Sequence, residues 1–164
     1  MKRIVQVTVG IIGAALLIYF ILKLFPNDVR VIEKNTKRLA ALASFTANEL
    51  PLSRLQNTRE LANFFATDAQ VAVDVPGASQ SISGREELFQ MAMAARSSHP
   101  GAQVDLLDVT VALDPGKKDA IVDTTLKAKL ANQSELVIQE LKITWRKLEG
   151  DWLIQKIETV RTVQ

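Results

Sequence analysis

The side chains able to do acid–base chemistry are few in this sequence. His99 is the only histidine, and its ring can act as a general acid or base near neutral pH. It lies where a predicted helix ends, and a histidine there commonly just complements the helix dipole. Asp74 follows alternating valines in a predicted strand, where it is either a functional carboxylate or a solvated, turn-capping one. Neither residue defines a reaction by itself.

Composition removes several other classes of site. The chain has 164 residues and no cysteine, which excludes thiolate catalysis, disulfides and cysteine-ligated zinc. A transition-metal site would need clustered carboxylates beside the one histidine, and no such cluster is evident. The sequence also has no glycine-rich phosphate loop. We therefore expect no cofactor and no metal ion.

The formal net charge of +2 is concentrated at the N-terminus. Lys2, Arg3 and Lys23 flank an uncharged run, and without these three positive charges the remainder carries −1. A basic surface for nucleic acid is therefore not supported, and we expect no nucleic-acid partner.

Residues 4–22 form that uncharged, mostly apolar run. At 1.5 Å per residue a helix over it spans roughly 28 Å, about the hydrocarbon thickness of a bilayer. The run ends in Lys23-Leu24-Phe25-Pro26, which offers no small-x-small site for cleavage of a signal peptide. We predict an uncleaved signal anchor, a single transmembrane helix within residues 1–25, that attaches the chain to the bacterial inner membrane.

The orientation of this anchor has two interpretations. Positive charges on both sides of the run, counted alone, favour a domain in the cytoplasm. A short basic start before an apolar run is instead the layout of an export signal, and long domains cross largely regardless of charge. We expect the domain, residues 26–164, to lie in the periplasm.

The first part of this domain has helical spacing of its apolar residues. Helices are predicted over residues 29–48, from Pro51 to residue 65, and from Gly84 to the region of His99. The polar face of the first helix is basic, which indicates either a lipid-headgroup contact or a solvated surface. A short strand over residues 71–75 ends at Pro76-Gly77, and a loop follows it.

Four longer strands complete the domain, over residues 103–113, 119–130, 135–147 and 152–163. In the last strand, Trp152 and Ile154 have one parity and Ile157 the other, which predicts a β-bulge near Lys156. Helices followed by hairpin-linked strands indicate an α+β fold. We expect three helices packed in a strongly curved mixed or antiparallel sheet, a cone with a cavity.

Polar residues between apolar ones on these strands are candidates for the orienting groups of such a cavity. Gln139, Gln155 and Arg161 fit this description, with outward solvation as the alternative for each. Trp145 is either a pocket wall or a core residue. The pocket candidates are thus Gln139, Gln155, Arg161, Trp145, His99 and Asp74.

Four short segments occur in an order and spacing that resemble a known superfamily. They are residues 64–69 (FFATDA), 75–77 (VPG), 83–88 (SGREEL) and 150–154 (GDWLI). Together they resemble the nuclear transport factor 2-like superfamily, which includes the SnoaL-like polyketide cyclases and ketosteroid isomerase. The resemblance covers residues 29–164 and implies the cone fold, which hosts enzymes, binding modules and transport factors alike.

The resemblance to ketosteroid isomerase implies a general-base aspartate on the strand after the second helix. Alignment places Val73 at that position, and Asp74, one residue later, faces the opposite side of a regular strand. The oxyanion-hole tyrosine of that enzyme is also missing, because the only tyrosine, Tyr19, lies in the predicted anchor.

Three functions follow as hypotheses. The first is a membrane-anchored, non-catalytic module that binds a small apolar ligand or a protein partner. The second is a SnoaL-like or ketosteroid isomerase-like enzyme (isomerase, cyclase or dehydratase), which requires a buried aspartate or histidine facing the cavity. The third is an assembly component that resembles type IV secretion inner-membrane proteins and uses its sheet to form a homodimer or to bind a partner.

Overall fold

The structure, a computed structural model, describes residues 27–75 and 78–160. No helix in these ranges is long and apolar enough to cross a membrane. The predicted anchor over residues 4–22 lies outside the described residues, as do the boundary between anchor and domain and the candidate Arg161.

Three helices and seven strands make up the described chain. In order they are α2 (Asp28–Ala43), β1 (Phe45–Thr46), α3 (Pro51–Asn63), β2 (Phe65–Val75), β3 (Ala78–Ser83), α4 (Arg85–Ser98), β4 (Gly101–Leu113), β5 (Asp119–Leu130), β6 (Leu136–Leu148) and β7 (Asp151–Thr159).

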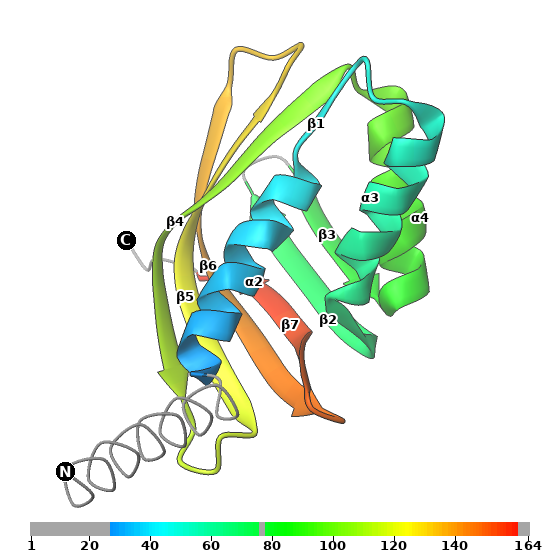
Figure 1. The fold of residues 1–164 in the computed structure, drawn as a ribbon. Helices are drawn as coiled ribbons and strands as arrows, with labels where there is room; N and C mark the ends of the chain where they lie inside the picture. The colour runs from blue at the N-terminus through cyan, green and yellow to red at the C-terminus, as the bar shows by residue number, and fades with distance from the viewer. Residues whose placement is uncertain (1–26, 76–77, 161–164) are drawn as a thin grey trace, which may run out of the picture.

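The seven strands form one sheet in the order β1-β4-β5-β6-β7-β2-β3. Neighbouring strands are antiparallel except β2 and β7, which are parallel. The sheet curves strongly around α2, while α3 and α4 lie beside each other near β2 and β3 (Figure 1). This arrangement confirms the predicted α+β class and its mixed, strongly curved sheet.

The first helix begins and ends where side chains can replace its missing hydrogen bonds. Asn27 Oδ1 accepts a hydrogen bond from the N–H of Val29 at 3.2 Å, which caps the N-terminus. The helix was expected to reach residue 48 but ends at Ala43. Ser44 adopts an extended backbone, and its hydroxyl accepts from the N–H of Val104 and donates to that residue's carbonyl. The chain after the helix is thereby joined to the edge of the sheet.

The segment after α3 differs from the prediction in two ways. Strand β2 begins at Phe65, six residues earlier than expected and directly after the helix. Residues 78–83, expected to form a loop, are strand β3, which pairs with β2 from Val75 opposite Ala78 to Gln70 opposite Ser83. Serine-rich β3 lacks the apolar alternation of a strand, so its conformation depends on pairing with β2.

Two β-bulges set which side chains face the helices. Between Leu107 and Thr110, β4 carries one more residue than β5, and Asp108 there has a φ of 53°. In β7, Ile154 and Lys156 pair with consecutive residues of β6, so the predicted bulge is confirmed, centred on residue 155. Each bulge shifts the inward parity by one residue.

Candidate functional site

A cavity of about 360 Å³ lies between the concave face of the sheet and the three helices. Nineteen residues line it, and they come from α2, α3, α4 and every strand except β1. This volume is in the range of small-molecule sites, which are commonly formed where several elements converge. A groove of about 490 Å³ also runs along the edge between β1 and β4, but only nine residues of neighbouring segments line it. We therefore take the interior cavity as the candidate site.

The chemistry of the cavity wall is almost entirely hydrocarbon. Gln80 is the single polar side chain among the nineteen described residues of the wall, and the wall contains no carboxylate, imidazole, amine or hydroxyl group. Gln80 is exposed, whereas Ile143 and Phe65 are only 1% and 4% exposed. The described wall thus combines buried apolar side chains with one amide that is exposed to solvent.

Helix α4 and strand β3 supply the residues that sequence reasoning missed. Met91, Ala92 and Ala95 face the cavity from one side of α4, at helical spacing. Gln80 and Ile82 face it from β3, at strand spacing. Their shared parity is the one signal that could have revealed Gln80.

The position that the sequence resemblance assigns to a general base holds an apolar side chain. Val73 lines the cavity, as the alignment implied for that position. Asp74 is exposed and is not part of the wall, and its backbone N–H donates to Thr159 Oγ1 at 3.2 Å. The alternation of a regular strand places these neighbours on opposite faces.

The two glutamine candidates of β6 and β7 are not in the described wall. The Gln139 amide donates to the carbonyl of Val160 at 3.2 Å, which links β6 to the residue that follows β7. Gln155 is the extra residue of the bulge in β7 and is half-buried. The structure therefore does not bring these candidates together with Gln80.

Trp145 and His99 also lie away from the cavity wall. Trp145 is fully buried in the core, and its ring meets Phe64 edge to face with 6.4 Å between centroids. Its indole N–H has no hydrogen-bond partner among the described residues. His99 caps the C-terminus of α4, where its Nδ1 lies 3.1 Å from Ser98 Oγ.

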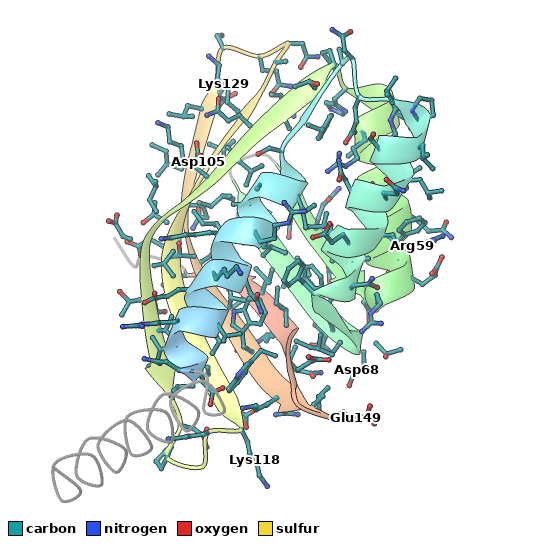
Figure 2. All side chains as sticks on the ribbon, viewed as in Figure 1. Arg59, Asp68, Asp105, Lys118, Lys129 and Glu149 are labelled. Carbon is teal, nitrogen blue, oxygen red and sulfur yellow. The ribbon has the colours of Figure 1, made fainter. Side chains whose placement is uncertain are left out.

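Arg96 is the most deeply buried charged side chain of the described residues, and it is already paired. Arg96 Nη1 lies 2.7 Å from both carboxylate oxygens of Glu49, and its Nη2 donates to the carbonyl of Leu42. Burial opposes ionisation of Glu49, but hydrogen bonds from Asn57 and Arg96 outweigh it and lower the pKa of that carboxyl group. Other charged side chains, such as those labelled Lys118 and Lys129, lie on the outside of the fold (Figure 2).

No protein-family model matches the sequence, and no curated protein matches it either. Solved structures do match. A scytalone dehydratase-like protein of Novosphingobium aromaticivorans is 16% identical with a TM-score of 0.59, over 83% of this chain and 85% of the other. A nuclear transport factor 2-like protein of unknown function from Pseudomonas putida is 9% identical with a TM-score of 0.60, over 83% and 87%.

A domain of unknown function with a cystatin-like fold from Nostoc punctiforme also matches this chain in structure. It is 16% identical with a TM-score of 0.60, over 85% of this chain and 80% of the other. Identities this low show a shared fold and do not carry an activity from one protein to another. The described chain therefore has the nuclear transport factor 2-like fold.

Proposed function

We propose that this protein is a binding module that holds a small apolar molecule in the cavity between its helices and its sheet. The observation that carries the proposal is the composition of the wall, which has eighteen apolar side chains and one amide. Transfer of apolar surface from water to such a wall is favourable by about 25 cal/mol per Å². A site of this kind selects its ligand mainly by shape and apolarity.

Binding is favoured over catalysis because of what the wall lacks. A general acid or base must lie within hydrogen-bond reach of the proton it transfers. The described wall has no titratable side chain, and Val73 lines it at the position that the resemblance to ketosteroid isomerase assigns to the base. The enzyme alternative is supported by the fold, which the scytalone dehydratase-like protein shares. It predicts that a bound molecule is chemically converted, whereas a binding module returns the molecule unchanged.

The attachment to a membrane is a further part of the proposal, and it comes from the sequence. Residues 4–22 are uncharged and long enough to span a bilayer. We propose that they anchor the domain to the bacterial inner membrane with the domain in the periplasm. Alkaline carbonate should leave the full chain in the membrane pellet and extract a variant lacking residues 4–22. Protease added to spheroplasts should digest the domain, and a protected domain would contradict this orientation.

Assembly with a second copy or another protein is the remaining alternative. The outer face of the sheet exposes apolar side chains, including Ile138, which is 62% exposed, and Leu136 and Ile121, each 42% exposed. Exposed apolar side chains on a sheet are a common feature of interaction surfaces. The mass of the extracted protein distinguishes this alternative, since it gives the oligomeric state directly.

Native mass spectrometry of the full-length chain, extracted gently, tests the binding proposal. We expect a small molecule to remain bound to the wild-type chain. Ala92→Phe places a ring in the cavity and should abolish this bound species. Ala94→Phe is the matched control, since Ala94 is exposed on the same helix and is not part of the wall. Equal occupancy of the two variants, or an empty wild-type chain, would contradict the proposal.

A further inference from the structure

We infer that the ligand of the cavity is uncharged and carries one hydrogen-bonding group, which it presents to Gln80. This inference rests on the proposed function, that the cavity binds an apolar molecule. It adds the chemical class: a neutral amphiphile such as an alcohol, ketone or amide with a hydrocarbon body. It also adds the orientation, with the hydrocarbon inside and the polar group at Gln80.

The residues of the cavity wall differ in exposure and in polarity. Three wall residues are buried: Ile143 is 1% exposed, Leu141 is 6% exposed and Phe65 is 4% exposed. Gln80, in contrast, is exposed, and it comes from β3, at the edge of the sheet. Gln80 is therefore the one side chain of the described wall that can form a hydrogen bond with a polar group of a ligand whose apolar part is buried.

The Gln80 side chain can both donate and accept hydrogen bonds. A primary amide has two N–H donors and a carbonyl acceptor, so it pairs equally well with a hydroxyl, a carbonyl or another amide. None of the described residues forms a hydrogen bond with this side chain. This exposed amide is thus available to a ligand in the cavity.

The described wall contains no charged side chain that could act as a counter-ion. Arg96, on the same helix as the wall residue Ala92, is already paired with Glu49. Asp74 lies on the face of β2 opposite Val73. A carboxylate or ammonium group held among the apolar side chains of the wall would lose hydration and gain no opposite charge, which is unfavourable. An uncharged polar group avoids this loss.

Three ligands with the same hydrocarbon chain test the inference: octan-1-ol, octanoate and octylammonium. Each is titrated calorimetrically at neutral pH into the full-length chain held in nanodiscs. Ala92→Phe in the same nanodiscs serves as the blank for partition into lipid. We expect octan-1-ol to bind at least about tenfold more tightly than either ion. Octanoate binding as tightly as octan-1-ol, or more tightly, would overturn the inference.

Substitutions at residue 80 provide the second arm of the test. Gln80→Met keeps the length of the side chain and removes its hydrogen bonds, so the affinity for octan-1-ol should fall about fivefold. Ser81→Met is the control, because Ser81 is exposed and follows Gln80 directly in the strand. Its side chain therefore points away from the cavity. Unchanged affinity in Gln80→Met would contradict the assigned role of the amide.

Gln80→Lys tests whether a positive charge at residue 80 increases the affinity for a negatively charged ligand. A cation at this position should raise the affinity for octanoate about fivefold or more and lower that for octylammonium. Because residue 80 is exposed, this variant should keep the wild-type fold. No change in octanoate affinity would show that the polar end of the ligand lies elsewhere.

The outcomes separate this inference from the proposed function. If octanoate binds most tightly and Ala92→Phe abolishes its binding, the cavity binds ligands and the inferred ligand class is wrong. If none of the three compounds gives a signal above the Ala92→Phe blank, both the ligand class and the binding function are contradicted.

Discussion

Arg96 and Glu49 form a buried ion pair that joins α4 to the chain before α3. The Arg96 and Glu49 side chains are only 2% and 10% exposed. The Arg96 guanidinium also lies 5.1 Å from the centre of the Phe45 ring. This pair fixes the helix that supplies Met91 and Ala92 to the cavity wall. The pair thus influences the cavity by holding α4 in place, and neither of its two residues lines the cavity.

Removal of Arg96 should destabilise the domain strongly. Arg96→Met leaves the Glu49 carboxylate buried without its partner, which costs about 3–5 kcal/mol in the free energy of unfolding. Arg38→Met is the matched control, because Arg38 pairs with Glu60 at the surface, where the two side chains are 52% and 46% exposed. That change should cost about 0–1 kcal/mol. Urea unfolding followed by circular dichroism measures both, and equal losses would contradict the account of the buried pair.

Asp28 should contribute a pH-dependent part of the stability. Its Oδ1 accepts hydrogen bonds from Lys147 Nζ at 2.9 Å and from the Trp152 indole N–H at 3.0 Å. These bonds, that of Lys147 first, lower the pKa of Asp28 below its ordinary 3.8. A lowered folded-state pKa gives stabilisation that is full above the unfolded value and is lost as the pH falls through the folded value.

The measurement is the free energy of unfolding of the wild-type chain and of Asp28→Asn between neutral pH and about pH 3. Asparagine keeps the accepting oxygen and removes the charge. We expect the wild-type chain to lose more stability than the variant as the pH falls below about 4. Parallel curves for the two chains would show that Asp28 contributes no such pH dependence.

The order of elements was predictable because several local signals agree with the final packing. Strand β5 has the predicted bounds, and Ala120, Val122 and Thr124, which share one parity along it, are all buried. The bulge in β7 was also visible as a local pattern. Each of these features depends on residues close together in the sequence.

The wall of the cavity was less predictable because it depends on pairing between strands. The serine-rich segment of β3 forms a strand only against β2, and that pairing brings Gln80 opposite Val73. Gln139 shares the parity of the wall residue Leu141, yet its amide bonds to Val160 at the end of the sheet. Which inward polar group meets the cavity thus depends on the curvature of the sheet, which no local pattern records.

Trp145 should behave as a core residue and not as a ligand contact. It is fully buried and packs edge to face on Phe64. Trp145→Ala should lower the free energy of unfolding by about 3–5 kcal/mol, because the surrounding core cannot fill the space. Ile138→Ala, on the outer face of the sheet, should change it by about 0.5 kcal/mol or less. Thermal unfolding compares the two variants. A small loss of stability for Trp145→Ala would contradict the assignment of Trp145 to the core.

The most direct test of ligand binding uses the methionine methyl groups. The chain has three methionines, and Met91 and Met93 lie on α4. Met91 lines the cavity, whereas Met93 does not, so the second methyl group is an internal control. In the full-length chain labelled with ¹³C at these methyl groups, octan-1-ol should shift the Met91 resonance in a saturable way and leave that of Met93 in place. An unchanged Met91 resonance, or equal shifts of the Met91 and Met93 resonances, would contradict binding in the cavity.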